Sequence, residues 1–314
     1  MDELADSSRF AGDQAVLRQR LAADGYLFFR GLLPAEQIAA ARAGVTSHLV
    51  GGGWLDGAGR PAGQRRGAEL AEALADPAFR RALASPDFNK IPYLPPLRQL
   101  VRTVLGAQAF SYPAKVLRTV YPEQRGARTK GRYAHHDYAV SGVQDMLTSW
   151  LPLMDIPVRL GGLAVRPGGH LGRPLVPSVL RPAQRGWATT DYRPGDVIIF
   201  HCLTPHAALP NMTSEFRLSG DFRWQLPDRA APAELVLAPV RPGAGPGQGV
   251  LGPDGQRWEL LSRLLARQPW WEPVPAGLTL RPRAQLVSAP PAPSRFFAMH
   301  PDWARWRPPP GVVH

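Results

Sequence analysis

Residues 216–226 read FRLSGDFRWQL, and large apolar side chains alternate with polar ones along this stretch. Because successive side chains of a strand point to opposite faces of a sheet, the alternation predicts a β-strand. The polar row either meets solvent, as in most sandwiches, or lines the interior of a jelly roll that holds a charged ligand. Periodicity leaves both arrangements open. The apolar members are Phe216, Leu218, Phe222, Trp224 and Leu226, and the polar members are Arg217, Ser219, Asp221, Arg223 and Gln225.

Further short strands, divided by Gly and Pro, are predicted from about residue 108 onward. Many short strands without helices repeated between them are typical of an antiparallel sandwich or barrel. We therefore expect a mainly β fold with flanking helices, built on a double-stranded β-helix, which is a cupin-like jelly roll. The predicted strands are AKVLRTVY (114–121), the segment around His135, MLTSWLPLMD (146–155), GGLAVRP (161–167), DVIIFH (196–201) and ELVLAPV (234–240).

Helical patterns occupy the first third of the chain. Asp13 precedes a run that carries Leu17 and Leu21 on one face, and Asp24-Gly25 supplies a stop signal. Proline suits the first turn of a helix, so Pro34 marks the beginning of a second one. A short strand is expected at 26–33, and further helical segments are expected at 68–83, 97–105 and 258–267.

The predicted domain organisation is one large domain with an extension. Residues 1–230 are expected to form the jelly-roll domain with its N-terminal helices. Residues 231–314, rich in Pro and Trp, are expected to pack on the same domain. This extension either covers the mouth of a pocket or mediates a subunit contact, and the sequence leaves that choice open.

Composition excludes several classes of protein. No apolar run approaches the roughly 18 residues that span a bilayer, and no secretory signal precedes the first helix. The single cysteine, Cys202, excludes a disulfide framework and a cysteine-rich zinc site. A soluble, cytoplasmic protein without a membrane partner, either monomeric or homodimeric, is the simplest expectation.

The net charge of +12 does not predict nucleic-acid binding. Of 37 basic residues only three are lysine, and the arginines are spread along the chain instead of forming one stripe. With 35 Pro and 31 Gly, this composition indicates a GC-rich genome. A small-molecule substrate is the expected partner.

A metal motif lies within the predicted strands. Residues 135–137 read His-His-Asp, so on an extended strand His135 and Asp137 would share a face and His136 would point away. One imidazole and one carboxylate are two ligands of the 2-His-1-carboxylate triad that binds Fe(II) in oxygenases. The third ligand would come from GDVIIFHCLTPHAALPN (195–211), which offers His201 and His206.

The ordered set of motifs resembles the phytanoyl-CoA dioxygenase family of Fe(II)/2-oxoglutarate-dependent oxygenases. The set is DGYLFFRGLLPAEQ, then His-x-Asp, then GGLAVRPGGH, then GDVIIFHxxxxH, then Asn211 and Arg217, and it covers roughly residues 15–226. The resemblance implies a dioxygenase that uses Fe(II), 2-oxoglutarate and O2 and releases succinate and CO2. Two departures are Gly169 in place of a serine and Ala207-Ala208 after the distal histidine.

The resemblance assigns the iron ligands to His135, Asp137 and His206. It assigns the arginine that pairs with the distal carboxylate of 2-oxoglutarate to Arg217, whose planar guanidinium can hold a carboxylate through two parallel hydrogen bonds. Ser219, two residues further on the same face, would add a third hydrogen bond, and Trp150 would line the co-substrate pocket.

The expected chemistry is hydroxylation of a small natural-product intermediate, with desaturation or oxidative cyclisation as alternatives. Related halogenases carry Ala or Gly where this chain has Asp137, so the carboxylate argues against halogenation.

His136, Tyr133 and Arg223 are candidate substrate contacts, although His136 could equally pack. Residues 122–132 form either a basic lid over the pocket or a solvated loop. Rival functions are a non-catalytic binding module and a zinc hydrolase; the latter would leave Arg217 and Ser219 without a role.

Overall fold

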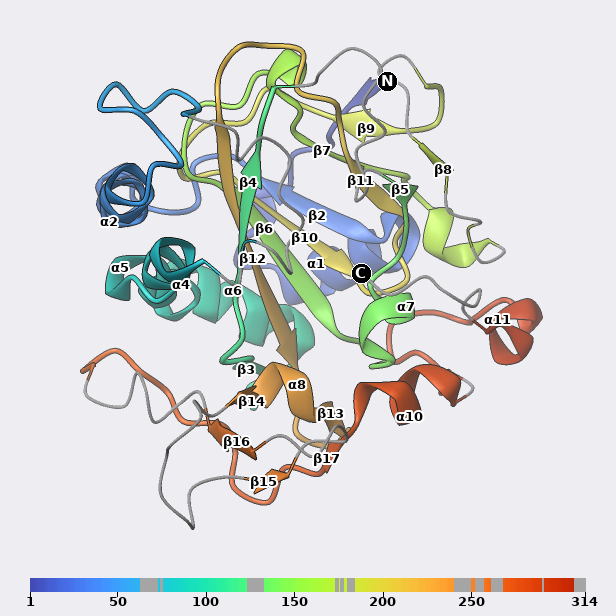
Figure 1. Ribbon diagram of the computed structural model, residues 1–314. Coiled ribbons are helices and arrows are strands. Elements are labelled where there is room, and N and C mark those ends of the chain that lie inside the picture. Colours follow the sequence, from blue (N-terminus) through green and yellow to red (C-terminus); the bar gives the residue numbers. More distant parts are fainter. Residues whose placement is uncertain are drawn as a thin grey trace.

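The computed structural model describes residues 1–62, 73, 76–122, 133–172, 175, 178–179, 184–239, 250–251, 257–260, 268–289 and 291–307. A large β-sheet forms its centre (Figure 1). Its strand order is β2-β10-β6-β12-β3, and β4 also pairs with β12. All of its pairings are antiparallel. The strands are β2 (Tyr26–Phe29), β3 (Phe110–Ser111), β4 (Val116–Val120), β6 (Leu147–Pro152), β10 (Val197–His201) and β12 (Arg217–Gln225).

A second sheet has the order β1-β9-β7-β11. A two-stranded pair, β5 and β8, continues this layer because His135 forms an isolated antiparallel bridge with His206 of β11. Two sheets of mostly antiparallel strands, with β1 and β9 as a parallel pair and helices around them, confirm the predicted jelly-roll core. The strands are β1 (Asp2–Glu3), β5 (Tyr133–Ala134), β7 (Leu163–Val165), β8 (Ser178–Val179), β9 (Ala188–Thr189) and β11 (His206–Ala208).

Helices cover one face of the large sheet, where α2, α4, α5 and α6 lie together (Figure 1). The side chain of Asp13 accepts a hydrogen bond from the amide of Val16 at the start of α1, and Gly25, with φ of +81°, ends the helix. Both boundaries were predicted from the sequence. The helices are α1 (Gln14–Asp24), α2 (Ala35–Gly51), α4 (Pro77–Leu83), α5 (Pro86–Lys90) and α6 (Pro95–Leu105), and 3-10 turns occupy Ser8–Phe10, Ile91–Tyr93, Val158–Leu160 and Gly169–Leu171.

Strand β12 is buried along its whole length, on both faces. Its apolar row packs into the same core as the helices, through Phe216, Leu218, Phe222 and Trp224. The polar row points to the other face and is buried as well, with Arg217 and Ser219 at 2% and 0% exposure. The polar row therefore lines the interior of the barrel and does not meet solvent.

The C-terminal extension shares an apolar cluster with the barrel. Trp303 and Val236 pack with Tyr138, Met146 and Leu203. Most described elements of the extension lie beside one end of the large sheet, at the bottom of Figure 1, while α11 lies apart from them on the right. They are β13 (Ala231–Pro232), α8 (Ala233–Val236), β14 (Leu237–Pro239), β15 (Val250–Leu251), β16 (Arg257–Leu260), β17 (Leu280–Arg281), α10 (Arg283–Ser288) and α11 (Pro301–Arg305).

Two predictions for the extension were wrong in part. Residues 257–260 form strand β16, paired with β14 and β15, and not the beginning of a helix. Residues 234–236 belong to a turn of helix, so the strand predicted for 234–240 is confined to β14. Short apolar segments fit either structure, and here pairing with distant strands decides. The rest of the predicted helix at 261–267 lies outside the described residues.

None of the helices that the structure describes combines the length and apolar character needed to cross a membrane. The segment predicted as a basic lid, 122–132, lies outside the described residues except for Pro122.

Candidate metal centre

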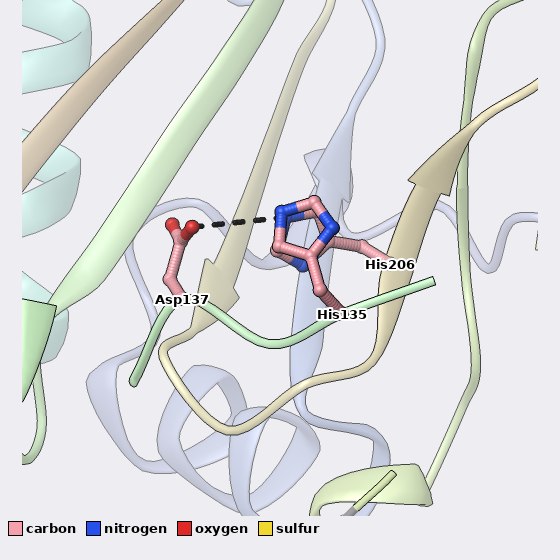
Figure 2. Close-up of side chains that lie close together, drawn as sticks. All are labelled: His135, Asp137 and His206. Atoms are coloured by element: carbon pink, nitrogen blue, oxygen red, sulfur yellow. Dashed lines mark ion pairs between the residues drawn. The ribbon is translucent and has the colours of Figure 1, made fainter. Parts of the chain in front are cut away.

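Three side chains converge between the two sheets (Figure 2). His135, Asp137 and His206 each offer a ligand atom, and these three atoms lie within 4.8 Å of one another. Oδ1 of Asp137 is 3.8 Å from Nε2 of His206. Two imidazoles and one carboxylate at this separation match the donor set of a facial triad. The sequence left His201 and His206 as competing third ligands, and the structure brings His206 to the cluster.

Main-chain pairing places the two histidines opposite each other. The amide of His135 donates to the carbonyl of His206 over 3.0 Å, and the amide of His206 donates to the carbonyl of His135 over 2.8 Å. This reciprocal pair is the hydrogen-bonded unit of an antiparallel ladder. The register of two backbones therefore sets the separation of the two imidazoles.

The carboxylate reaches the cluster by another route. Asp137 has helical φ and ψ and caps α7 (Tyr138–Ser141), so the chain has already left the extended conformation at this residue. The strand alternation used above to place His135 and Asp137 on one face thus does not describe this backbone. A tight turn after His135 brings the two side chains together instead.

Carbonyl groups orient both imidazoles. Nδ1 of His135 lies 2.8 Å from the carbonyl oxygen of Tyr133, and Nδ1 of His206 lies 3.0 Å from that of Thr204. A carbonyl only accepts, so Nδ1 carries the hydrogen and Nε2 is the nitrogen that can offer a lone pair to a metal. Burial lowers the pKa of His206, partly opposed by the charge of Asp137, and this favours the neutral imidazole that a metal requires.

Asp137 is held as an anion. Burial alone would raise its pKa, but the positive charge of Arg223 and the neighbouring histidines outweigh burial and keep the pKa well below its usual range. Nε of Arg223 lies 3.5 Å from Oδ2, and the hydroxyl of Thr148 donates a hydrogen bond to the same oxygen. Oδ1 is the oxygen that faces His206. Thr148 and Arg223 therefore hold Oδ2 of the carboxylate, and Oδ1 is directed at the cluster.

A second polar site, formed by Arg217 and Ser219, lies on the face of β12 that also carries Arg223. Arg217 donates through Nη1 to the carbonyl of Gly161, and its guanidinium carbon lies 5.9 Å from the ring centre of Trp150. Nε of Arg217 and Oγ of Ser219 are both buried without a hydrogen-bond partner among the described residues. Burial lowers the pKa of Arg217 to about 10, so the group stays cationic at neutral pH. One orphaned donor on a buried cation and one orphaned hydroxyl on the same strand face fit the carboxylate of a bound anion such as 2-oxoglutarate.

The candidate substrate contacts occupy three different environments. Arg223 pairs with Asp137, as described above. Tyr133 is 37% exposed, and its carbonyl accepts from His135. His136 is 1% exposed and packs against the rings of Trp303 and Trp306. The contacts of His136 are therefore those of a packed side chain, which was the alternative to a substrate contact.

Sequence reasoning missed Thr148 and the pair Arg118–Asp221. Thr148 lies two residues before Trp150 on β6, and alternation along the predicted strand could have placed it on the interior face. Arg118 on β4 contacts Oδ2 of Asp221 through Nε and Nη2, both at 2.8 Å. This pair depends on the register of β4 against β12, which the sequence does not state.

Comparisons with known proteins agree with this geometry. The family model for phytanoyl-CoA dioxygenase matches residues 21–219. The 1-deoxypentalenic acid 11-beta-hydroxylase of Streptomyces exfoliatus is 25% identical over 253 residues, which cover 72% of this chain and 86% of the relative.

Two solved structures share the fold. The non-haem monooxygenase ThoJ in its apo form has a TM-score of 0.53 at 18% identity, over 85% of this chain and 88% of ThoJ. EctD from S. alaskensis with 2-oxoglutarate and 5-hydroxyectoine has a TM-score of 0.51 at 18% identity, over 90% of this chain and 92% of EctD. The family match spans well over half of the chain and includes all three residues of the metal cluster and the arginine–serine pair. The chain therefore belongs to the phytanoyl-CoA dioxygenase family, and it is a non-haem iron oxygenase that uses Fe(II), 2-oxoglutarate and O2.

Proposed function

We propose that the protein hydroxylates a small natural-product intermediate, with His135, Asp137 and His206 as iron ligands and Arg217 and Ser219 as the 2-oxoglutarate clamp. The observation that carries the proposal is the pair of orphaned buried donors on Arg217 and Ser219, on the same strand face as Arg223. A buried cation with unused donors is costly unless a ligand completes it.

Each residue has a distinct task in this scheme. His135 and His206 present Nε2, and Asp137 presents Oδ1, while Thr148 and Arg223 hold the other oxygen of the carboxylate. Bound Fe(II) would supply oxygen activation and abstraction of hydrogen from the substrate. The surrounding buried strands exclude water from the interior. No side chain is needed as a nucleophile.

An acidic substrate fits the interior best. Arg118 has a side chain 39% exposed, while its partner Asp221 is buried. Asp221 lies on β12 between Ser219 and Arg223, so the pair sits on the same strand face as the clamp and the arginine that contacts Asp137. Asp221 holds Nε and Nη2 of Arg118, which leaves Nη1 of this partly exposed side chain for a carboxylate group of the substrate. The name of the Streptomyces relative gives an acid as that enzyme's substrate.

The test is succinate formation and O2 consumption with Fe(II) and 2-oxoglutarate, screened over small carboxylic acids and their methyl esters. We expect turnover that needs both Fe(II) and 2-oxoglutarate and that favours acids over esters. Asp137→Ala should abolish substrate-dependent succinate release, whereas His48→Ala on helix α2 serves as a control that retains it. Full activity of Asp137→Ala would refute the ligand assignment.

The mass of the product identifies the reaction. Hydroxylation adds one oxygen atom to the substrate, whereas desaturation and oxidative cyclisation each remove two hydrogens. Loss of hydrogens without gain of oxygen would replace hydroxylation by one of these alternatives.

A further inference from the structure

The metal-binding loop rests on the C-terminal extension. We use "metal loop" for residues 135–142 and "clasp" for the described residues of 283–306. Helices α10 and α11 of the clasp lie beside α7 of the metal loop (Figure 1). The family model ends at residue 219, so the clasp lies outside the part of the chain that defines the family.

The first contact is made by the middle residue of the metal motif. The ring of His136 meets Trp303 edge-on with ring centres 5.0 Å apart, and meets Trp306 in the same way at 4.7 Å. His136 and Trp303 are both buried, at 1% exposure each. Because His136 lies between two metal ligands in sequence, a ring fixed here restricts the backbone of both neighbours.

The second contact lies directly behind Asp137, on α7. The hydroxyl of Tyr138 donates to the carbonyl of Ala289 over 3.1 Å. Gly142 ends α7 with φ of +67°, and a Cβ there would lie 2.3 Å from the carbonyl carbon of Leu286 in α10. The two backbones therefore touch without an intervening side chain.

A buried carboxylate anchors the clasp. Asp145 accepts hydrogen bonds from Ser294 at 2.7 Å and from the amide of Arg295 at 2.9 Å, and its carboxylate also lies 3.1 Å from Nε2 of His201. Among the described residues other than glycine, Asp145 alone has a positive φ, of +60°. Such a conformation persists only where surrounding contacts determine it. Through these contacts Asp145 joins the clasp to β10 of the large sheet.

We propose that the clasp is the positioning element of the metal site and that His136 is the positioning residue through which Trp303 and Trp306 hold the metal loop. The proposal rests on the proposed iron ligands. His135 and His206 are already paired through their backbones, but Asp137 sits on a turn that the ladder does not fix. Residues that support ligands in this way determine metal affinity.

The test measures metal binding by the full-length apoprotein, with Co(II) as the probe and without 2-oxoglutarate or substrate. Trp306→Ala should weaken Co(II) binding about tenfold, the lower end of the loss expected when support for a ligand is removed. At saturating Fe(II), kcat should stay near the wild-type value while the KM for Fe(II) rises. Trp306→Phe keeps an aromatic edge and should restore the affinity.

The chain provides a matched control on the same extension. Trp270 packs against Tyr93, with ring centres 5.4 Å apart, far along the chain from the metal loop. Trp270→Ala removes an aromatic contact of similar size and should leave Co(II) affinity unchanged. Urea unfolding of each variant shows whether it folds. If Trp306→Ala does not fold, the pair His136→Ala and His136→Phe replaces it, with affinity lost in the first and kept in the second.

The outcomes separate the two proposals. If wild-type protein binds no Co(II), the ligand assignment fails. If wild-type protein binds and a folded Trp306→Ala binds equally well, the clasp has no positioning role and only this inference is overturned. Loss of affinity in His136→Phe as well as His136→Ala would also overturn it, because the imidazole itself would then be needed.

Discussion

Replacing Arg217 tests the co-substrate clamp most directly. The guanidinium is buried, donates through Nη1 to Gly161, and leaves Nε with no partner among the described residues. Oγ of Ser219 on the same face is orphaned too. If both groups are reserved for the distal carboxylate of 2-oxoglutarate, their loss should weaken co-substrate binding without disturbing the metal cluster.

The magnitude follows from the hydrogen bonds that each change removes. A hydrogen bond to a charged group contributes about 1.5–3 kcal/mol. Lysine in Arg217→Lys keeps the charge but loses the planar fork, so we expect a loss of about 2 kcal/mol, or roughly 30-fold in affinity. Ser219→Ala removes a single hydroxyl donor to the carboxylate and should cost about 1.5 kcal/mol, or roughly tenfold in affinity.

The assay is the KM for 2-oxoglutarate in succinate formation, supported by thermal unfolding with and without the co-substrate. Ligand binding stabilises the folded state by RT ln(1 + [L]/Kd), so the wild-type shift should shrink in both variants. A pKa of about 10 leaves Arg217 charged throughout the neutral range, so the effect should not change with assay pH between about 6 and 8.

Co(II) affinity is the internal control, since Arg217 does not belong to the metal cluster. A KM for 2-oxoglutarate that stays at the wild-type value in Arg217→Lys would refute the clamp. Equal loss of Co(II) and 2-oxoglutarate affinity would mean that the substitution damages the barrel, and the stated reasoning would fail.

Three further changes have defined outcomes. Thr148→Val removes the hydroxyl that orients Asp137 and should weaken Co(II) binding about tenfold in a calorimetric titration, with folding intact. Burial lowers the pKa of His170 to about 4, so the unfolded chain takes up a proton first as the pH falls; stability should drop by about 3 kcal/mol between pH 6.5 and 4 in urea unfolding, and less in His170→Gln. Gly142→Ala places a methyl group against the backbone of α10 at a residue whose φ is already unfavourable for alanine, and should lower the free energy of unfolding by about 3 kcal/mol. Gly31→Ala, with φ of +59° and open space around it, should lower the free energy of unfolding by about 1 kcal/mol.

The sequence predicted the elements whose signals are local. The side-chain cap at Asp13 and the left-handed Gly25 bound α1 at the expected residues. Alternation along 216–226 predicted β12, and only the structure could decide that the polar row faces inward. That decision depends on which sheet and helices pack against each face, and periodicity carries no information about the partner.

The candidate site shows the same division. Residue type and motif order predicted that His135, Asp137 and His206 would be ligands, and the structure brings them together. Strand alternation gave the wrong backbone for Asp137, which lies in a helical turn. Thr148 and Arg223 support the carboxylate across β6 and β12, so their role follows from strand register, which no local pattern in this chain specifies.

The residues that offer ligand atoms and the residues that hold them in place are different in this protein. The two histidines are fixed by a backbone pair that does not depend on neighbouring side chains, and Asp137 is oriented by residues of the large sheet. The side chain of His136 takes part neither in the backbone pair nor in the orientation of Asp137, so it can contact the elements that lie behind the metal loop. In this chain that is the clasp, through Trp303 and Trp306. On its proposed role, a change in the clasp would act on metal affinity through the metal loop, because the polar row of β12 keeps its place through the pairing of β12 with β4 and β6.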